Sequence, residues 1–195
     1  MKQKKQLILE TAISSIEKYG VIATNAQLIA KELGIAQSTV FYHFPKQKQL
    51  FEELFSFIVR YNQSEVQKRL DKNRSSKNLI KLTSYLEGNL DWAFAHRDHV
   101  VVLLNSVVES THNEVLKGQL DYIFNNGEEK IYNILTAGII ENEFTLSQKA
   151  KPLARSIHKF LIGTIISTVF DNHKKAKTIE FVKDHVRKLI VEVSE

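Results

Sequence analysis

Five side chains between residues 37 and 43 can exchange hydrogen bonds without bringing a negative charge to the surface. They are Gln37, Ser38, Thr39, Tyr42 and His43. Amide, hydroxyl and imidazole groups can bond to base edges and phosphate oxygens in a DNA groove, whereas an acidic group would be repelled there. This segment therefore predicts a contact with DNA.

The positive charge of the chain is concentrated in the same region. Residues 1 to 50 contain seven lysines and three glutamates, a net charge of +4, whereas the remaining residues contain 20 basic and 19 acidic side chains, a net charge of +1. A basic segment beside a nearly neutral remainder indicates that the segment meets a polyanion. Charge alone is also compatible with a lysine-rich surface that faces only solvent.

Two short helices joined at Gly34 must hold the polar side chains in place. Residues 26 to 44 have apolar side chains where the two helices would pack on each other, and the small Ala30 where they would cross. The apolar positions are Ile29, Leu33, Ile35 and Val40. Since glycine also permits the sharp turn between the helices, the segment predicts a helix-turn-helix.

The rest of the chain is also predicted to be helical. An apolar stripe from Ile8 to Tyr19 predicts a helix that ends at Gly20, and Thr24 or Asn25 can cap the next one, Thr24 with Gln27 as a capping box. No sustained alternation of apolar and polar residues supports a strand. Further helices are expected at 47–71, 77–95, 98–110, 112–142, 149–172 and 177–193.

The expected fold is therefore all-α, with two parts. A change in composition after residue 46 places a three-helix domain with a helix-turn-helix at 1–46 and a larger all-helical domain at 47–195. The chain has no cysteine, no glycine-rich phosphate loop and no nucleophile elbow, so we expect neither an enzyme nor a cofactor. The N-terminus is too polar for a signal peptide and no apolar run reaches the ~20 residues of a membrane span, so we expect a cytoplasmic protein that contacts no membrane.

The first ~51 residues resemble the DNA-binding domain of the TetR family of bacterial one-component repressors. The matching residues are Ile8, Ala12, Ile16, Gly20, Thr24, Ile29, Ala30, Gly34, Thr39, Tyr42, His43, Phe44 and Leu50. The resemblance implies a homodimer on double-stranded operator DNA, with a C-terminal domain that binds a small ligand. It also implies that Thr24, Thr39, Tyr42 and His43 contact phosphate and that Gln37 and Ser38 touch base edges.

Three residues depart from the family pattern. Phe41 stands where a tyrosine is usual, Ala36 replaces a frequent serine or threonine cap, and Gln47 replaces a lysine, although Lys46 and Lys48 flank it. Either lysine can supply the missing charge, and we include both, with Asn25, in the predicted DNA-binding set. Lys2, Lys4 and Lys5 are expected to form a frayed, solvated terminus, and the alternative is an arm that approaches the DNA backbone or the minor groove.

The larger domain is expected to bind a small, hydrophobic ligand that releases the repressor from DNA. A mostly apolar pocket uses few polar groups for specificity, and the candidates are set among bulky apolar residues. They are Tyr61, Asn89, Trp92, Asn105, Glu109, His112, Tyr122 and His158. The alternative is a helix-turn-helix protein regulated by a protein partner. His96 and His99 are three residues apart, but their spacing implies no further ligand, so no metal is expected.

The last two helices are expected to form the homodimer interface. Each carries a stripe of apolar residues at three- and four-residue spacing, and two such helices from each chain would make a four-helix interface. The predicted interface residues are Leu161, Ile165, Thr168, Val182, Val186 and Leu189. The alternative is that both stripes face the core of their own chain.

Overall fold

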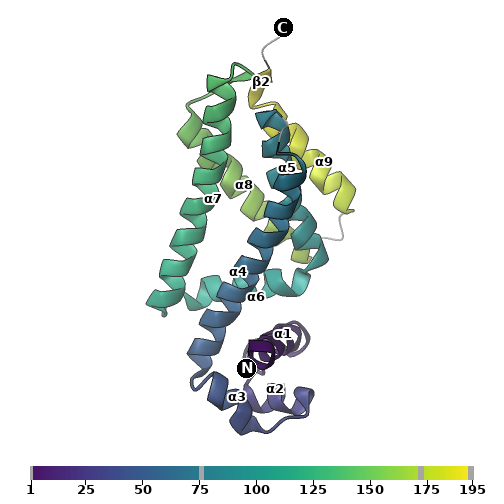
Figure 1. Cartoon of the computed structure of the whole chain (residues 1–195), viewed down its shortest axis with the longest axis vertical. Coiled ribbons are helices and arrows are strands. Elements are labelled where there is room, and N and C mark those ends of the chain that lie inside the picture. Colours follow the sequence, from purple (N-terminus) through teal and green to yellow (C-terminus); the bar gives the residue numbers. More distant parts are fainter. Residues whose placement is uncertain (1, 75–76, 171–173, 193–195) are drawn as a thin grey trace. The chain divides into compact units, whose positions relative to one another are not determined.

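The computed structural model describes residues 2–74, 77–170 and 174–192 and confirms the all-α class (Figure 1). The helices within these ranges are α1 (Lys2–Tyr19), α2 (Ala26–Leu33), α3 (Gln37–His43), α4 (Gln47–Lys72), α5 (Asn78–Ala95), α6 (Arg97–Glu109), α7 (Glu114–Ile140), α8 (Ala150–Phe170) and α9 (Lys175–Arg187). The first helix already begins at Lys2, and Lys5 forms an ion pair of 2.9 Å with Glu53 of α4. The expectation of a frayed terminus is therefore wrong at Lys5.

Two short strands were not predicted. Strand β1 (Phe144–Leu146) pairs antiparallel with β2 (Ile190–Glu192), with Thr145 opposite Val191. The predicted last helix, 177–193, therefore ends early, at Arg187, and a strand follows. Three residues are too few for an alternating pattern to stand out in the sequence, so this pairing depends on tertiary contacts.

The chain divides into two compact units. Unit 1 contains residues 1–61 and 96–120, and unit 2 contains residues 62–95 and 121–195, so α4 and α7 each contribute to both. This division follows packing, whereas the predicted boundary after residue 46 follows composition. A separate DNA-binding domain at 1–46 stays a prediction.

Unit 1 is built on the packing of α6 against α1. Ile8, Ile16, Phe55 and Val102 are almost completely buried in its core. Asn113 is buried as well, where its side-chain oxygen accepts hydrogen bonds from the first backbone N–H groups of α7. The helices α1, α2 and α3 therefore share one compact unit with α6, on which α1 packs.

Unit 2 is organised around α5, which packs against α8 and α9. Beside its apolar core, Glu87 of α5 is paired with Arg69 of α4 and Lys183 of α9, and Asp91 of α5 with Arg69 and Lys175. Burial opposes the charge on Glu87, but hydrogen bonds from Lys183 and Arg69 outweigh it and hold the pKa of this carboxyl below its usual value.

The stripe predicted to face a partner faces the core of unit 2. Leu161, Ile165 and Thr168 of α8 and Val182 and Val186 of α9 are all buried within the single chain. The expectation that these five residues form a dimer interface is therefore wrong, because periodicity identifies an apolar face but not what covers it. Leu189, which follows α9, is only half-buried.

The α8 helix is long and apolar enough, by length and composition alone, to cross a membrane. Seven of its 21 residues are buried in the structure. One such helix is weak evidence for a membrane span, because the core helix of a soluble protein meets the same two criteria. The absence of a membrane partner stays a prediction.

We predict opposite effects for two glycines of α7. A Cβ on Gly138 would overlap the buried ring of Phe144, whereas one on Gly118 would meet only open space. Gly138→Ala should therefore lower the free energy of unfolding by ~1–3 kcal/mol through overpacking. Gly118→Ala, the matched control, should raise it by ~0.5–1 kcal/mol because alanine favours the helix. Urea denaturation of both variants measures the difference, and equal effects would contradict the described packing of Phe144.

Candidate nucleic-acid interface

The α3 helix has one buried face and one exposed face. Val40 is completely buried and Phe44 is 3% exposed, while Gln37 and Ser38 are exposed and Tyr42 is 70% exposed. Thr39 and His43 are half-buried, and the His43 ring lies edge-on to that of Tyr42, with 5.2 Å between centroids. All five predicted polar side chains therefore belong to one short helix whose apolar side is anchored.

Gly34 sets the turn into this helix. Its backbone is left-handed, with φ of 63°, and its N–H reaches the last carbonyls of α2, as predicted for a glycine between two short helices. The first turn of α3 has no such help, because Ala36 stands at its N-cap and forms no side-chain hydrogen bond. The missing cap costs ~0.5–2 kcal/mol relative to serine or aspartate.

Asn25, and not Thr24, caps α2. The Asn25 side-chain oxygen accepts hydrogen bonds from the backbone N–H groups of Gln27 and Leu28, both 3.0 Å long. Thr24 is completely buried, and its hydroxyl donates to the Gly20 carbonyl oxygen at 2.9 Å. The predicted capping box at Thr24 is therefore wrong, and so is a phosphate contact by its hydroxyl.

Gln47, which replaces the usual lysine, links α4 to the start of α2. Its side-chain nitrogen donates to the Thr24 carbonyl oxygen at 3.3 Å. Lys46 and Lys48 on either side are both exposed to solvent. The glutamine thus serves a structural contact, and a phosphate contact by Lys46 or Lys48 stays a prediction.

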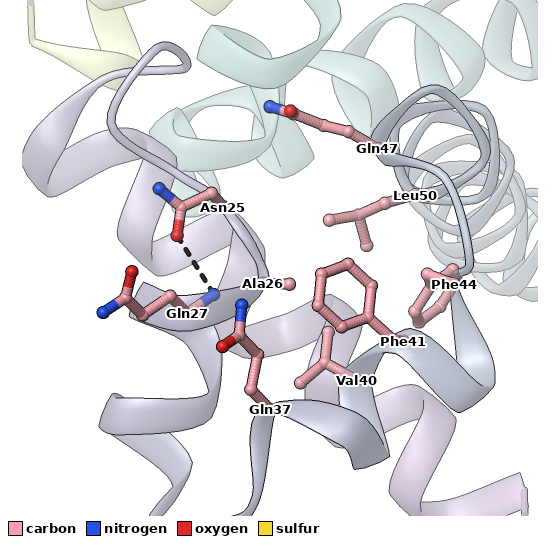
Figure 2. Close-up of a pocket in the computed structure, with 9 residues that line it drawn as sticks. All are labelled: Asn25, Ala26, Gln27, Gln37, Val40, Phe41, Phe44, Gln47 and Leu50. Carbon is pink, nitrogen blue, oxygen red and sulfur yellow. Dashed lines mark hydrogen bonds between the residues drawn. The ribbon is translucent and has the colours of Figure 1, made fainter.

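A small pocket of about 170 Å³ lies between α2, α3 and the start of α4 (Figure 2). Four apolar side chains and four amide side chains line it, with Ala26 between them: Val40, Phe41, Phe44, Leu50, Asn25, Gln27, Gln37 and Gln47. Phe41 is 47% exposed. The phenylalanine that replaces the usual tyrosine is thus only partly covered, and its ring lines this pocket.

The predicted ligand residues are not gathered in one place. Asn89, Trp92 and His158 are buried in unit 2, while Tyr61 and Asn105 are partly exposed in unit 1. Glu109, His112 and Tyr122 are exposed to solvent, so the expectation that they line an enclosed pocket is wrong. Helical spacing alone does not reveal which side of a helix is covered.

Among the buried candidates, His158 has an unused polar atom. Its side chain is 3% exposed, and Nδ1 is buried without a hydrogen-bond partner in the described part of the chain. Burial lowers the pKa of this imidazole, although the charge of Glu128 opposes the shift. Gly127 lies directly against the ring and Phe124 packs edge-on to it, with 5.9 Å between centroids.

Comparison with known proteins identifies the N-terminal part. Residues 8–54 match the model of the family described as bacterial regulatory proteins, tetR family. The nucleoid occlusion factor SlmA of Vibrio cholerae is 25% identical over 134 residues, 68% of this chain and 66% of that protein. The fatty acid metabolism regulator protein of Bacillus subtilis is 28% identical over 179 residues, 87% of this chain and 84% of that one.

The similarity in fold extends over the whole chain. A transcriptional regulator from Saccharomonospora viridis, crystallised in complex with choline, superposes with a TM-score of 0.85 at 22% identity, covering 99% of this chain and 100% of that one. A regulator from Haloarcula marismortui gives a TM-score of 0.83 at 15% identity and covers 97% of each chain. At these identities the likeness establishes the fold.

We predict that two residues of α3 affect DNA binding differently. Tyr42→Ala should weaken binding to every sequence, because it removes a phosphate contact, whereas Gln37→Ala should change base preference at one position by ~1–3 kcal/mol. Gln63→Ala, a change at an exposed position on α4, is the control. Selection of a bound sequence followed by fluorescence anisotropy measures both effects. Equal affinities for all three variants and the original chain would refute the assignment of α3.

Proposed function

Because the chain belongs to the TetR family of bacterial regulatory proteins, we propose that it is a ligand-responsive repressor that binds a palindromic operator as a homodimer. As a member of this family it is a DNA-binding transcriptional regulator and not an enzyme. The observation that carries the proposal is the two-sided α3 helix, which buries Val40 and leaves Gln37, Ser38 and Tyr42 exposed. Such a regulator acts on DNA in the bacterial cytoplasm.

The α3 helix enters the major groove in this proposal. Gln37 and Ser38, at its N-terminal end, contact base edges, while Thr39, Tyr42 and His43 bond to phosphate oxygens. Asn25 and the exposed Lys46 and Lys48 extend the contact along the DNA backbone. Since lysines displace counterions from the duplex, the affinity falls steeply as salt concentration rises.

The dimer forms through the outer faces of α8 and α9. Phe170 and Phe181 are 74% and 61% exposed, far more than is usual for phenylalanine. On the same outer side, Phe160 packs against Phe181 and His185, with ring centroids 5.8 and 4.4 Å apart. Gly163, on the exposed side of α8, leaves open space in which a second helix can approach closely. A second copy of the chain covers this surface.

We predict that two changes on this surface produce monomers. Phe181→Glu places a charge where the partner packs, and Gly163→Leu fills the space into which the partner's helix fits. Ile80→Glu is the control, since Ile80 is an exposed apolar residue on α5 of the same unit. Light scattering should give the monomer mass of 22.4 kDa for the first two variants and twice that mass for the control. A dimer that survives both changes would contradict this interface.

The proposed ligand binds within unit 2, where the Nδ1 atom of His158 is buried and has no hydrogen-bond partner among the described residues. A ligand group that bonds this nitrogen would remove the cost of burying it unpaired, ~1–3 kcal/mol. The Phe124 ring beside His158 suits a mainly hydrophobic ligand, in keeping with the relative named as a fatty acid metabolism regulator. One structural neighbour was crystallised with choline, so a small cation is the second ligand class to test.

We predict that ligand and operator weaken each other's binding. A ligand that lowers the affinity of the protein for its operator must itself bind the operator complex more weakly than it binds the free protein. The two affinities fall by the same factor, typically ~5–150-fold. Palmitate and choline are the probes for the two ligand classes, titrated by calorimetry into the free protein and into its operator complex. His158→Phe should abolish the effect of the active probe. Equal dissociation constants for both forms, with both probes, would contradict regulation by these ligand classes.

The second candidate function is regulation through a protein partner. It is favoured by the similarity to nucleoid occlusion factors, whose name refers to no small ligand and which match over most of the chain in several Vibrio species. In this case α3 still binds DNA, and a protein partner instead of a small ligand binds the surface of the larger C-terminal part. Mass spectrometry of the natively purified protein distinguishes the two candidates, since a ligand-responsive form retains a small molecule.

A further inference from the structure

Three potential metal ligands converge at the start of α6. His96 is the N-cap residue of this helix, and Asp98 and His99 lie in its first turn. Each offers one ligand atom, and these atoms all lie within 4.8 Å of one another. The sequence pointed to the two histidines only, because it gave no reason for a third group to join them. The structure adds the carboxylate.

The two imidazole rings form a cluster with a third ring. They are stacked, with centroids 4.8 Å apart and planes 18° from parallel, and the ring of Tyr61 on α4 packs edge-on to both. His99 is buried, whereas His96 and Asp98 are half-buried. The cluster therefore combines one fixed ligand with two that solvent and an incoming ion can reach.

We propose that His96, Asp98 and His99 bind a divalent transition-metal ion, with Zn²⁺ as the representative ion. Two imidazole nitrogens and one carboxylate oxygen suit zinc, nickel or cobalt, whereas Mg²⁺ and Ca²⁺ prefer oxygen ligands alone. In tetrahedral coordination, metal–nitrogen and metal–oxygen bonds of about 2.0–2.2 Å place the ligand atoms ~3.3–3.6 Å apart. The ligand atoms of the cluster lie within 4.8 Å of one another, so the half-buried His96 and Asp98 side chains move closer to His99 when the ion binds, and water completes the coordination.

The charges around the site also fit. The N-terminal end of a helix carries a partial positive charge that disfavours a cation. The carboxylate of Asp98 offsets this effect.

The location of the site gives the ion a route to influence DNA binding. The α6 helix packs on α1, and both belong to the unit that contains α2 and α3. An ion bound to both the N-cap residue and the first turn would fix the start of α6. Because α1 packs on α6, the bound ion would also limit the motion of α1. This consequence, unlike the metal site itself, depends on the proposed DNA-binding function.

Calorimetric titration of the EDTA-treated, dialysed full chain with Zn²⁺ tests the site. We expect one strongly bound ion per chain, with an affinity reduced at least ~10-fold in His96→Gln and in Asp98→Asn. Both changes are at half-buried positions, so the variants should fold. His112→Gln, at an exposed histidine of the same unit, is the matched control. Zn²⁺ affinity equal in all four proteins, or no binding tighter than millimolar, would overturn the site.

A second measurement confirms the ligands without relying on affinity. Co²⁺ bound to the original chain should give visible ligand-field absorption, which His96→Gln should change and His112→Gln should not. An unchanged spectrum in His96→Gln would overturn the role of that residue.

The influence on DNA is measured separately. Saturating Zn²⁺ should shift operator affinity in the original chain at least ~5-fold and leave His96→Gln unaffected. Zn²⁺ that binds without changing operator affinity would overturn the coupling but not the site. If the protein binds no DNA with or without Zn²⁺, the proposed function fails, while the calorimetric result stands.

Discussion

The burial of Val40 and Phe44 is the interaction on which the DNA-binding surface depends. The α3 helix has only seven residues, and a helix this short is not stable alone in water. It also lacks a side-chain cap at Ala36, so its own sequence does little to start it. Packing must therefore supply the stability, and packing fixes the rotation of the helix about its axis. The outward direction of Gln37, Ser38 and Tyr42 is a consequence of what Val40 and Phe44 bury.

The neighbouring contacts serve the same end. Gly34 closes α2 in a left-handed conformation, Asn25 caps its start, and Gln47 ties the first turn of α4 to the Thr24 carbonyl group. Ser15 of α1 adds a hydrogen bond of 2.7 Å to Glu32 of α2. Each of these is a polar contact that fixes the end or side of a short helix, where apolar area is scarce. The hydrogen bond from Gln47 to the Thr24 carbonyl oxygen gives a structural reason for a glutamine at a position where a lysine is usual in the family.

The sequence predicted those features that depend on neighbouring residues. Left-handed glycines, the uncapped Ala36 and the helix-turn-helix follow from local rules that need no knowledge of the rest of the fold. Features that depend on distant partners were not predicted correctly. The stripe of Leu161, Val182 and Val186 is a true helical periodicity, but periodicity does not say whether the chain or a partner covers it. Glu109 and Tyr122 failed as pocket residues for the same reason, and β1 and β2 are too short to leave a pattern.

The cluster of His96, Asp98 and His99 depends on an irregular backbone. In a regular helix the three side chains would not point to one place. In an ideal helix, residues 96 and 99 share a face, but residue 98 is rotated about 100° from residue 99 and about 200° from residue 96. His96, however, has φ of −133° and ψ of 62°, outside the helical range, because it is the N-cap residue. This single non-helical residue alters the direction of one side chain relative to the first turn. Three groups within four residues can then meet, which helical periodicity applied to the sequence would not suggest.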